Sequence, residues 1–349
     1  MRLNSIDYFR AVAILFIVAG HSFGSWKVDN FIEKAIFNLL TGGTTLFVFI
    51  SGFLFHYIYY RNFSYKTFLL KKFRYVYFPY LLLTLSGITY YLISEENLPS
   101  QGPLGIDHLE TLFDYIHMIA LYLWTGKIVV GYWYIQFIAI IFILSPVFIY
   151  YMKFPFWARN ALFLIFLIQS MLIHRPFGNF SPWHSVLYFL PIYLMGINVS
   201  IHRKKVIDFI SDKTLIIGML VLALALLQAS IYSKHGNFHK IEIFSYQNMD
   251  IIILQKIALC FFLMSLFHRF EERQLNSLKG IASMSFAIYF IHPWILKLLF
   301  KSEFLNYFKV VPELGLTVFR ASVVFILSMT IAYFTKILLK EKSRFVTGW

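Results

Sequence analysis

The sequence has few charged residues and a single cysteine. Only 14% of its 349 residues are Asp, Glu, Lys or Arg, against ~25% in a typical soluble domain. The one cysteine, Cys260, lies in an apolar run, so no intrachain disulfide and no Cys-based metal site can form. Acidic residues are scarcer than basic ones, 17 against 31, and the formal net charge is +14. These shortages exclude a disulfide-stabilised scaffold and argue against a soluble globular domain.

Apolar residues make up 59% of the chain, and aromatic residues 20%. Runs long enough to cross a bilayer recur along the whole sequence. We expect about ten membrane-spanning helices, near 8–24, 44–60, 75–93, 131–151, 157–173, 185–201, 214–232, 249–267, 281–299 and 317–339. Arg10 interrupts the first run and no A-x-A-like site follows it, so we expect no signal peptide. The sequence predicts an all-α polytopic membrane protein with one membrane-embedded domain over residues 1–349.

The cations cluster in alternate short loops, a distribution that argues against nucleic acid as a partner. One set of loops holds Arg61, Lys66, Lys71, Lys72, Arg74, Lys153, Arg159, Arg203, Lys204, Lys205, Lys213, Arg269, Arg273, Lys279, Lys336, Lys340, Lys342 and Arg344. The other set is richer in acids, with Asp29, Glu33, Glu95, Glu96, Asp107, Glu110, Asp114, Glu242, Asp250, Glu303 and Glu313. The positive-inside rule places the first set and both termini in the cytoplasm.

The longest predicted outer loop is Glu95–Val130. Its Asp107 and Glu110 have the spacing of a capping box, which predicts a helix start. The apolar segment that follows, Leu112–Leu123, is too short to span the membrane, and we expect it to be re-entrant or interfacial.

Arg10 and His21 lie eleven residues apart in the first predicted span. A helix turns about 100° per residue, so both side chains fall within roughly 20° of one face, separated by about 16 Å along the axis. Ionisable residues inside a membrane helix are costly and usually face a cavity or a partner. The alternatives are a histidine that is merely hydrogen-bonded within the bundle and an arginine that snorkels to the interface, or pairs with Asp7.

Three further groups of residues are candidates for chemistry or packing. Lys71, Lys72 and Arg74 either anchor the chain at lipid head groups or hold phosphates. Ser51 and Gly52 interrupt an aromatic run, which is typical of close helix packing. In the ninth predicted span, the polar side chains share one face, as expected of a cavity wall: Ser285, Tyr289 and His292.

Taken together, these stretches resemble the acyltransferase-3 family of integral membrane acyltransferases. The resemblance rests on the order and spacing of five motifs: Ile6-Asp7-x-x-Arg10-Ala11-x-Ala13 through Gly20-His21, Phe47-Val48-Phe49-Ile50-Ser51-Gly52-Phe53, Lys71-Lys72-x-Arg74 before Pro79-Tyr80, Tyr188-Phe189-x-Pro191-x-Tyr193-x-Met195-Gly196, and Ser285-x-x-x-Tyr289-x-x-His292. Lys71 stands where an Arg is common. We also expect the hydrolase-like domain fused to some members to be missing.

The resemblance implies transfer of an acyl group, usually acetyl, from cytoplasmic acyl-CoA to a hydroxyl of an extracytoplasmic glycan. It assigns the CoA phosphates to Lys71, Lys72 and Arg74, with Ser51 in the same donor site, and no metal. His21 would be the general base or carry the acyl group. Arg10 would lie just inside the inner mouth. His292 and Tyr289 would orient His21 or polarise the thioester carbonyl.

Two points remain open at this stage. Family members often carry a Glu a few residues after the Trp of the fourth span, whereas this chain has Gln136. Any role of that Glu in activating a histidine must be absent or supplied elsewhere. The competing function is a polysaccharide exporter or flippase without acyl-CoA dependence. In either case we expect a bacterial cytoplasmic membrane, with membrane lipids and a glycan as partners.

Overall fold

A computed structural model of the protein describes residues 3–24, 26–94, 96–100, 102–106, 109–231, 235–245, 248–302 and 312–349. The described chain is helical apart from two very short strands that pair in parallel, Arg175 opposite His239 and Pro176 opposite Lys240. The α-helices are α1 (Asn4–His21), α2 (Phe31–Leu40), α3 (Gly43–Leu54), α4 (Tyr65–Lys72), α5 (Phe78–Ser94), α6 (Leu112–Thr125), α7 (Trp133–Ile143), α8 (Ser145–Tyr151), α9 (Phe156–Ile173), α10 (Pro182–Ile201), α11 (Arg203–Ile210), α12 (Thr214–Ile231), α13 (Ile252–His268), α14 (Asn276–Lys301), α15 (Glu313–Leu339) and α16 (Ser343–Val346). The remaining elements are the π-helices η1 (Phe55–Tyr59) and η3 (Phe73–Tyr77), the 3-10 turns η2 (Tyr60–Asn62), η4 (Gly102–Leu104), η5 (Phe177–Asn179) and η7 (Lys340–Lys342), and the strands β1 (Arg175–Pro176) and β2 (His239–Lys240).

Seven helical segments of the described chain are long and apolar enough to cross a membrane. They are Phe31–Asn62, Tyr65–Ser94, Phe156–Ile173, Pro182–Ile201, Thr214–Ile231, Asn276–Lys301 and Glu313–Val346. The helices α7 and α8, bent by 57° at their junction, make an eighth if they form one broken span. The prediction of an all-α polytopic membrane protein is confirmed. The count of about ten crossings and the cytoplasmic termini stay predictions, with α1 and the 17-residue α13 occupying the two further predicted spans.

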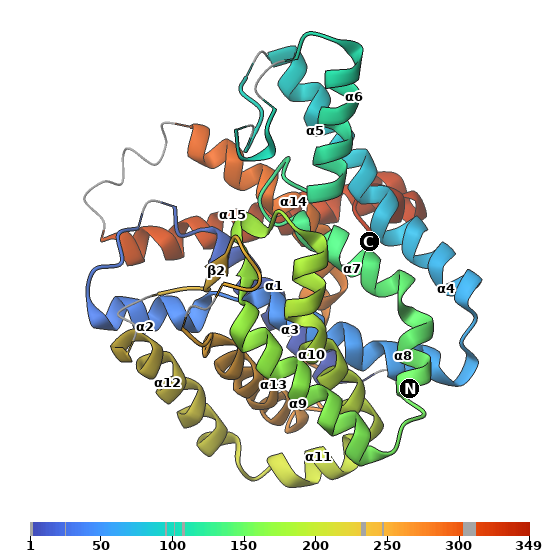
Figure 1. Ribbon diagram of the computed structural model, residues 1–349, viewed down its shortest axis with the longest axis vertical. Helices are drawn as coiled ribbons and strands as arrows, with labels where there is room; N and C mark the ends of the chain where they lie inside the picture. The colour runs from blue at the N-terminus through green and yellow to red at the C-terminus, as the bar shows by residue number, and fades with distance from the viewer. Residues whose placement is uncertain are drawn as a thin grey trace.

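The centre of the bundle is formed by α1, α3 and α10, with α13 and α14 beside them (Figure 1). In α10, 78% of the apolar stretch is buried inside the protein, against 28% in each of α9, α12 and α15. Large apolar side chains of those outer helices are exposed, among them Leu164, Leu222 and Ile326. An apolar outer surface over a buried polar centre is what a lipid environment requires, because hydrocarbon offers polar groups no hydrogen bonds.

The helices α3 and α10 approach each other backbone to backbone. A Cβ atom added at Gly52 would lie 2.1 Å from the carbonyl oxygen of Tyr193, and one added at Gly196 would lie 2.2 Å from that of Phe49. Small residues permit this approach between membrane helices, where packing rather than the hydrophobic effect drives association. The close packing predicted from Ser51-Gly52 is therefore present.

The helix α6 lies within the predicted outer loop and runs alongside α5 (Figure 1). Its capping box is formed by Thr111 and Asp114, whose side chains each accept the other's backbone N–H. The predicted box used Asp107, which lies outside the described residues. The hydroxyl of Tyr80 donates to the carbonyl oxygens of Tyr122 and Leu123 at 3.1 and 3.0 Å, which ties the end of α6 to the start of α5.

Both ends of the described chain lie at the end of the bundle where α1 begins. The backbone N–H groups of Asn4 and Ser5 donate to the carboxylate of Glu271, in the turn before α14. Gly348 packs against Phe286 of α14, and Trp349 lines the same cavity as Arg10. The two ends therefore share one side of the protein.

The α3–α10 contact makes Gly52→Ala destabilising. The added methyl would overlap the Tyr193 carbonyl and force the helices apart, at a cost of about 1–3 kcal/mol. Thermal unfolding in detergent should show a lower melting temperature. The matched control is Gly280→Ala in α14, where a Cβ has no heavy atom within 4 Å. Equal melting temperatures for the two variants would contradict the close approach.

The membrane orientation can be tested by labelling single cysteines with an impermeant reagent. Cys260 is fully buried, and a Cys260→Ser background removes it. Exposed positions serve as sites: Glu242 beside β2 should react from outside, while Lys205 in α11 and Glu341 in η7 should react only after permeabilisation. Labelling of Lys205 in intact cells would invert the predicted orientation of the later helices.

Candidate functional site

His21 and His292 are hydrogen-bonded partners at the centre of the protein. His21 Nδ1 lies 2.9 Å from His292 Nε2, and the rings are nearly parallel with centroids 5.2 Å apart. His292 Nδ1 lies 3.0 Å from the carbonyl oxygen of Ile288, which can only accept, so Nδ1 carries the proton. With both rings uncharged, His292 Nε2 is then the acceptor and His21 Nδ1 the donor. This leaves the lone pair of His21 Nε2 free to accept a proton.

The pair is held by α1 and α14, which pack along each other. His292 is fully buried, whereas His21 keeps partial exposure. The hydroxyl of Tyr289 donates to the carbonyl oxygen of Gly131 at 2.6 Å. Gly131 has φ +93°, and a Cβ there would lie 3.0 Å from His21 Cε1. Tyr289 thus fixes the loop that packs on His21, and only glycine fits at that point of the loop.

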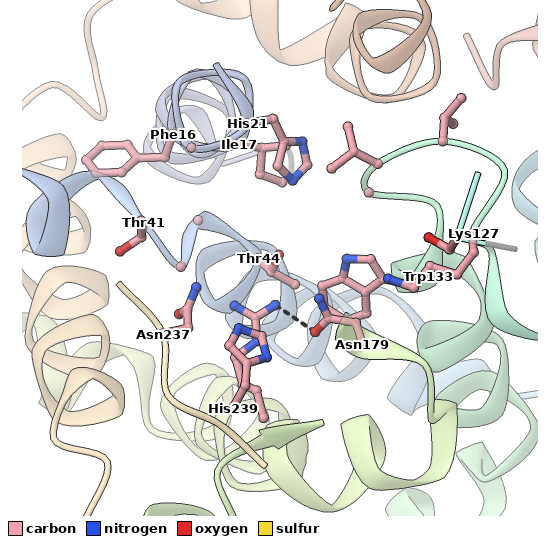
Figure 2. Close-up of a pocket in the computed structure, with 18 of the residues that line it drawn as sticks. Phe16, Ile17, His21, Thr41, Thr44, Lys127, Trp133, Asn179, Asn237 and His239 are labelled. Carbon is pink, nitrogen blue, oxygen red and sulfur yellow. Dashed lines mark hydrogen bonds between the residues drawn. The ribbon is translucent and has the colours of Figure 1, made fainter. Parts of the chain in front are cut away.

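His21 faces a cavity of about 370 Å³, here called the outer cavity (Figure 2). Its walls come from α1, the turn between α2 and α3, the loop before α7, and the segments around β1 and β2. The polar and aromatic residues in its lining include His21, Thr41, Thr44, Ser100, Lys127, Trp133, Arg175, Asn179, Asn237 and His239.

Sequence reasoning missed most of the outer cavity. Lys127, Arg175 and His239 were not among the candidates, although Lys127 and Arg175 each stand in a segment otherwise free of Lys and Arg. That local scarcity was the available signal. What brings Arg175 and His239 together is the pairing of β1 with β2, two strands too short to be recognised in a sequence.

Arg10 lies in a second cavity, at the opposite end of α1. This inner cavity has a volume of about 530 Å³. Its lining combines four cations and one carboxylate, Glu341, which pairs with Lys336 at 3.6 Å, with hydroxyl and aromatic groups: Arg10, Lys72, Tyr75, Ser283, Ser285, Phe286, Lys336, Glu341, Arg344 and Trp349. Arg10 also forms the predicted ion pair with Asp7, at 3.3 Å. The concentration of positive charge suits an anion such as a phosphate.

The structure brings only part of the predicted donor site into the inner cavity. Lys72 lines it, whereas Lys71, Arg74 and Ser51 line neither the inner nor the outer cavity. The guanidinium of Arg74 lies over the ring of Phe345 at 4.6 Å, and Lys71 is exposed. Lys336 and Arg344, which the sequence analysis assigned only to a cytoplasmic loop, take their place in the lining.

Gln136 does not line the outer cavity. It is buried in α7 and lines a separate cavity with Lys72 and Trp124. The partner of His21 in this chain is His292. Among the described residues, no cluster of three His, Cys, Asp or Glu side chains could hold a metal ion.

Comparison with known proteins identifies the family. Residues 3–336 match the acyltransferase-3 family, described as an acyltransferase domain. Probable poly-beta-1,6-N-acetyl-D-glucosamine export proteins are similar to this chain. The protein of Staphylococcus aureus strain MSSA476 is 24% identical over 319 residues, covering 84% of this chain and 82% of the relative. That of Staphylococcus epidermidis is 24% identical over 327 residues, covering 86% and 83%. No solved structure matches. The chain belongs to the acyltransferase-3 family of integral membrane acyltransferases.

Proposed function

We propose that this protein transfers an acyl group, most simply acetyl, from cytoplasmic acyl-CoA to a hydroxyl of a cell-surface or lipid-linked glycan. The proposal rests on two consecutive hydrogen bonds. His21 Nδ1 donates to His292 Nε2, and His292 Nδ1 donates to the Ile288 carbonyl, so that His21 Nε2 is left as an acceptor at the outer cavity. A partly exposed imidazole with one free lone pair beside a cavity is suited to general-base catalysis. The family supplies the reaction class.

The reaction balances with the groups present. His21 Nε2 takes the proton of the acceptor hydroxyl while the hydroxyl oxygen forms a bond to the thioester carbon. The carbon–sulfur bond breaks, and coenzyme A leaves as a thiolate that is protonated from the donor side. In the alternative course, the same lone pair of His21 attacks the thioester carbon, the carbon–sulfur bond breaks and coenzyme A leaves as a thiolate. The acceptor hydroxyl then attacks the acyl carbon, the acyl–nitrogen bond breaks, and the released Nε2 takes the hydroxyl proton.

The donor is assigned to the inner cavity. Coenzyme A carries phosphates on its nucleotide and ends in a long arm that bears the thioester. Arg10, Lys72 and Arg344 supply cationic hydrogen-bond donors for phosphates. His21 lies eleven residues further along α1, about 16 Å along the axis, which is of the order of the arm's length.

Export is the second candidate function. The relatives are named as probable glycan export proteins. A transporter would use the outer cavity to bind sugar and would need no acyl-CoA. The staphylococcal relatives also support a bacterial cytoplasmic membrane as the location.

Replacing His21 by Ala should reduce acyl transfer at least about 100-fold, because removal of a general base costs ~10²–10⁴ in rate. Transfer of labelled acetyl from acetyl-CoA to extracted glycan measures this. His117→Ala, at an exposed position of α6, is the matched control and should leave transfer unchanged. Near-normal transfer by a folded His21→Ala protein would contradict the catalytic role.

Coenzyme A should raise the melting temperature of the purified protein in detergent, because a ligand that binds only the folded state stabilises it. Lys72→Gln and Arg344→Gln should reduce the rise, since each removes a cation from the inner cavity. Lys66→Gln, an exposed cation on α4, should leave it unchanged. If saturating coenzyme A gives no rise in the parent protein, the donor site is wrong and export is favoured.

A further inference from the structure

The outer cavity holds two cations and no carboxylate among the described residues of its lining. The cations are Lys127, before α7, and Arg175, in β1. Neither forms an ion pair within 4 Å with any residue of the described chain. Two unpaired cations in one enclosed space are costly unless an anion joins them.

Arg175 is 5% exposed and only partly satisfied. Its Nη2 donates to Asn179 Oδ1 at 3.2 Å, the dashed line in Figure 2, and its guanidinium lies 5.1 Å from the Trp133 ring centroid. Its Nε is buried without a hydrogen-bond partner among the described atoms. Arginine offers five donors in a planar fork, so unused donors remain for a ligand.

The carboxylate that acts electrostatically on Arg175 is Asp250, which does not line the cavity. Asp250 accepts from the hydroxyl of Tyr188 at 2.8 Å and from the backbone N–H of Ile252 at 3.0 Å. Each carboxylate oxygen of Asp250 therefore already accepts a hydrogen bond, one from Tyr188 and one from Ile252. Because Asp250 does not line the cavity, the side of Arg175 that faces the cavity has no carboxylate beside it.

Lys127 is fixed beside the same space. Its ammonium donates to the carbonyl oxygen of Gly178 and lies 4.6 Å from the ring centroid of Phe180. Burial, and then the charge of Arg175, lower the pKa of Lys127 to about 8, so the ammonium is still the main form at neutral pH. A bound anion would relieve the repulsion between the two cations.

The rest of the lining suits a sugar ring. Asn179 and Asn237 offer amide donors and acceptors to sugar hydroxyls, while the ring of Trp133 packs against Arg175 and Phe189 and holds the guanidinium in place. His239 Nδ1 lies 2.9 Å from the carbonyl oxygen of Pro176 and donates to it, so the second ring nitrogen of an uncharged ring accepts. Burial, and then the charge of Arg175, lower the pKa of His239 to about 4, which keeps it uncharged at neutral pH.

We propose that the outer cavity binds an anionic sugar, with the carboxylate or phosphate of the glycan held by Arg175 and Lys127 and its hydroxyls facing Asn179 and Asn237. The assignment rests on the proposed function only in taking this cavity as the acceptor side. The proposed site would reject a sugar with a free amino group, because its ammonium would be repelled by the Arg175 guanidinium. Carboxylate and phosphate share the oxyanion chemistry, and the test separates them.

The test measures binding of monosaccharides to the purified protein in detergent, without any acyl donor, by calorimetry. The probes are glucuronate, glucose 1-phosphate, glucose and glucosamine. At least one of the two sugar acids should bind about tenfold more tightly than glucose, and glucosamine more weakly than glucose, because a charge-assisted hydrogen bond contributes about a tenfold change or more. Tighter binding of glucuronate identifies a carboxylate sugar, and tighter binding of glucose 1-phosphate a sugar phosphate.

Arg175→Gln and Lys127→Gln should each abolish the preference for the acid, and Lys127→Arg should keep it. Lys27→Gln, at an exposed position, is the matched control and should keep the full preference. Equal binding of glucose and both acids, or a preference that survives Arg175→Gln and Lys127→Gln, would overturn the proposal. Acetate and inorganic phosphate binding as tightly as the sugar acids would overturn the assignment to a sugar. If coenzyme A gives no rise in melting temperature but the preference for the sugar acid is present, the result counts against acyl transfer and leaves the anionic-sugar site standing.

Discussion

In an apolar bundle, each buried polar side chain must find a partner inside the protein, because hydrocarbon offers no hydrogen bonds. That constraint fixes the arrangement of the central helices here. His21 on α1 and His292 on α14 are hydrogen-bonded to each other, and the Nδ1–H of His292 donates to the Ile288 carbonyl oxygen. Among the described residues, three of the four ring nitrogens of the pair have a hydrogen-bond partner, and the fourth is His21 Nε2.

The same two helices connect the cavities. At their inner end, Arg10 of α1 and Ser285 of α14 line the cation-rich cavity. At their outer end, His21 lines the sugar-sized cavity, and Tyr289 anchors the Gly131 loop against it. The polar stripes of α1 and α14 are thus parts of one wall that runs through the bundle, while lipid-facing positions remain apolar.

Sequence alone could predict what depends on local periodicity. The apolar runs predicted a helical membrane protein. Helical spacing placed Arg10 and His21 on one face of the first span, and it placed three polar residues on one face of the ninth: Ser285, Tyr289 and His292. Periodicity could not predict that His21 meets His292, 271 positions away, because packing between distant helices decides that contact; only the family resemblance suggested that His292 orients His21. A π-helical turn at Phe73–Tyr77 and the folding back of the segment after α15 decide which cations reach the inner cavity. The meeting of Arg175 with His239 depends on the pairing of two strands that are only two residues long, β1 and β2.

The two cavities share no lining residue and lie at opposite ends of α1. Under the proposed reaction, neither coenzyme A nor the glycan would need to cross the bilayer, and only the acyl group would pass between the two compartments. Catalysis would then be vectorial. In sealed vesicles with donor on one side, molecules inserted in one orientation would turn over, and those inserted in the other would be silent until the membrane is opened.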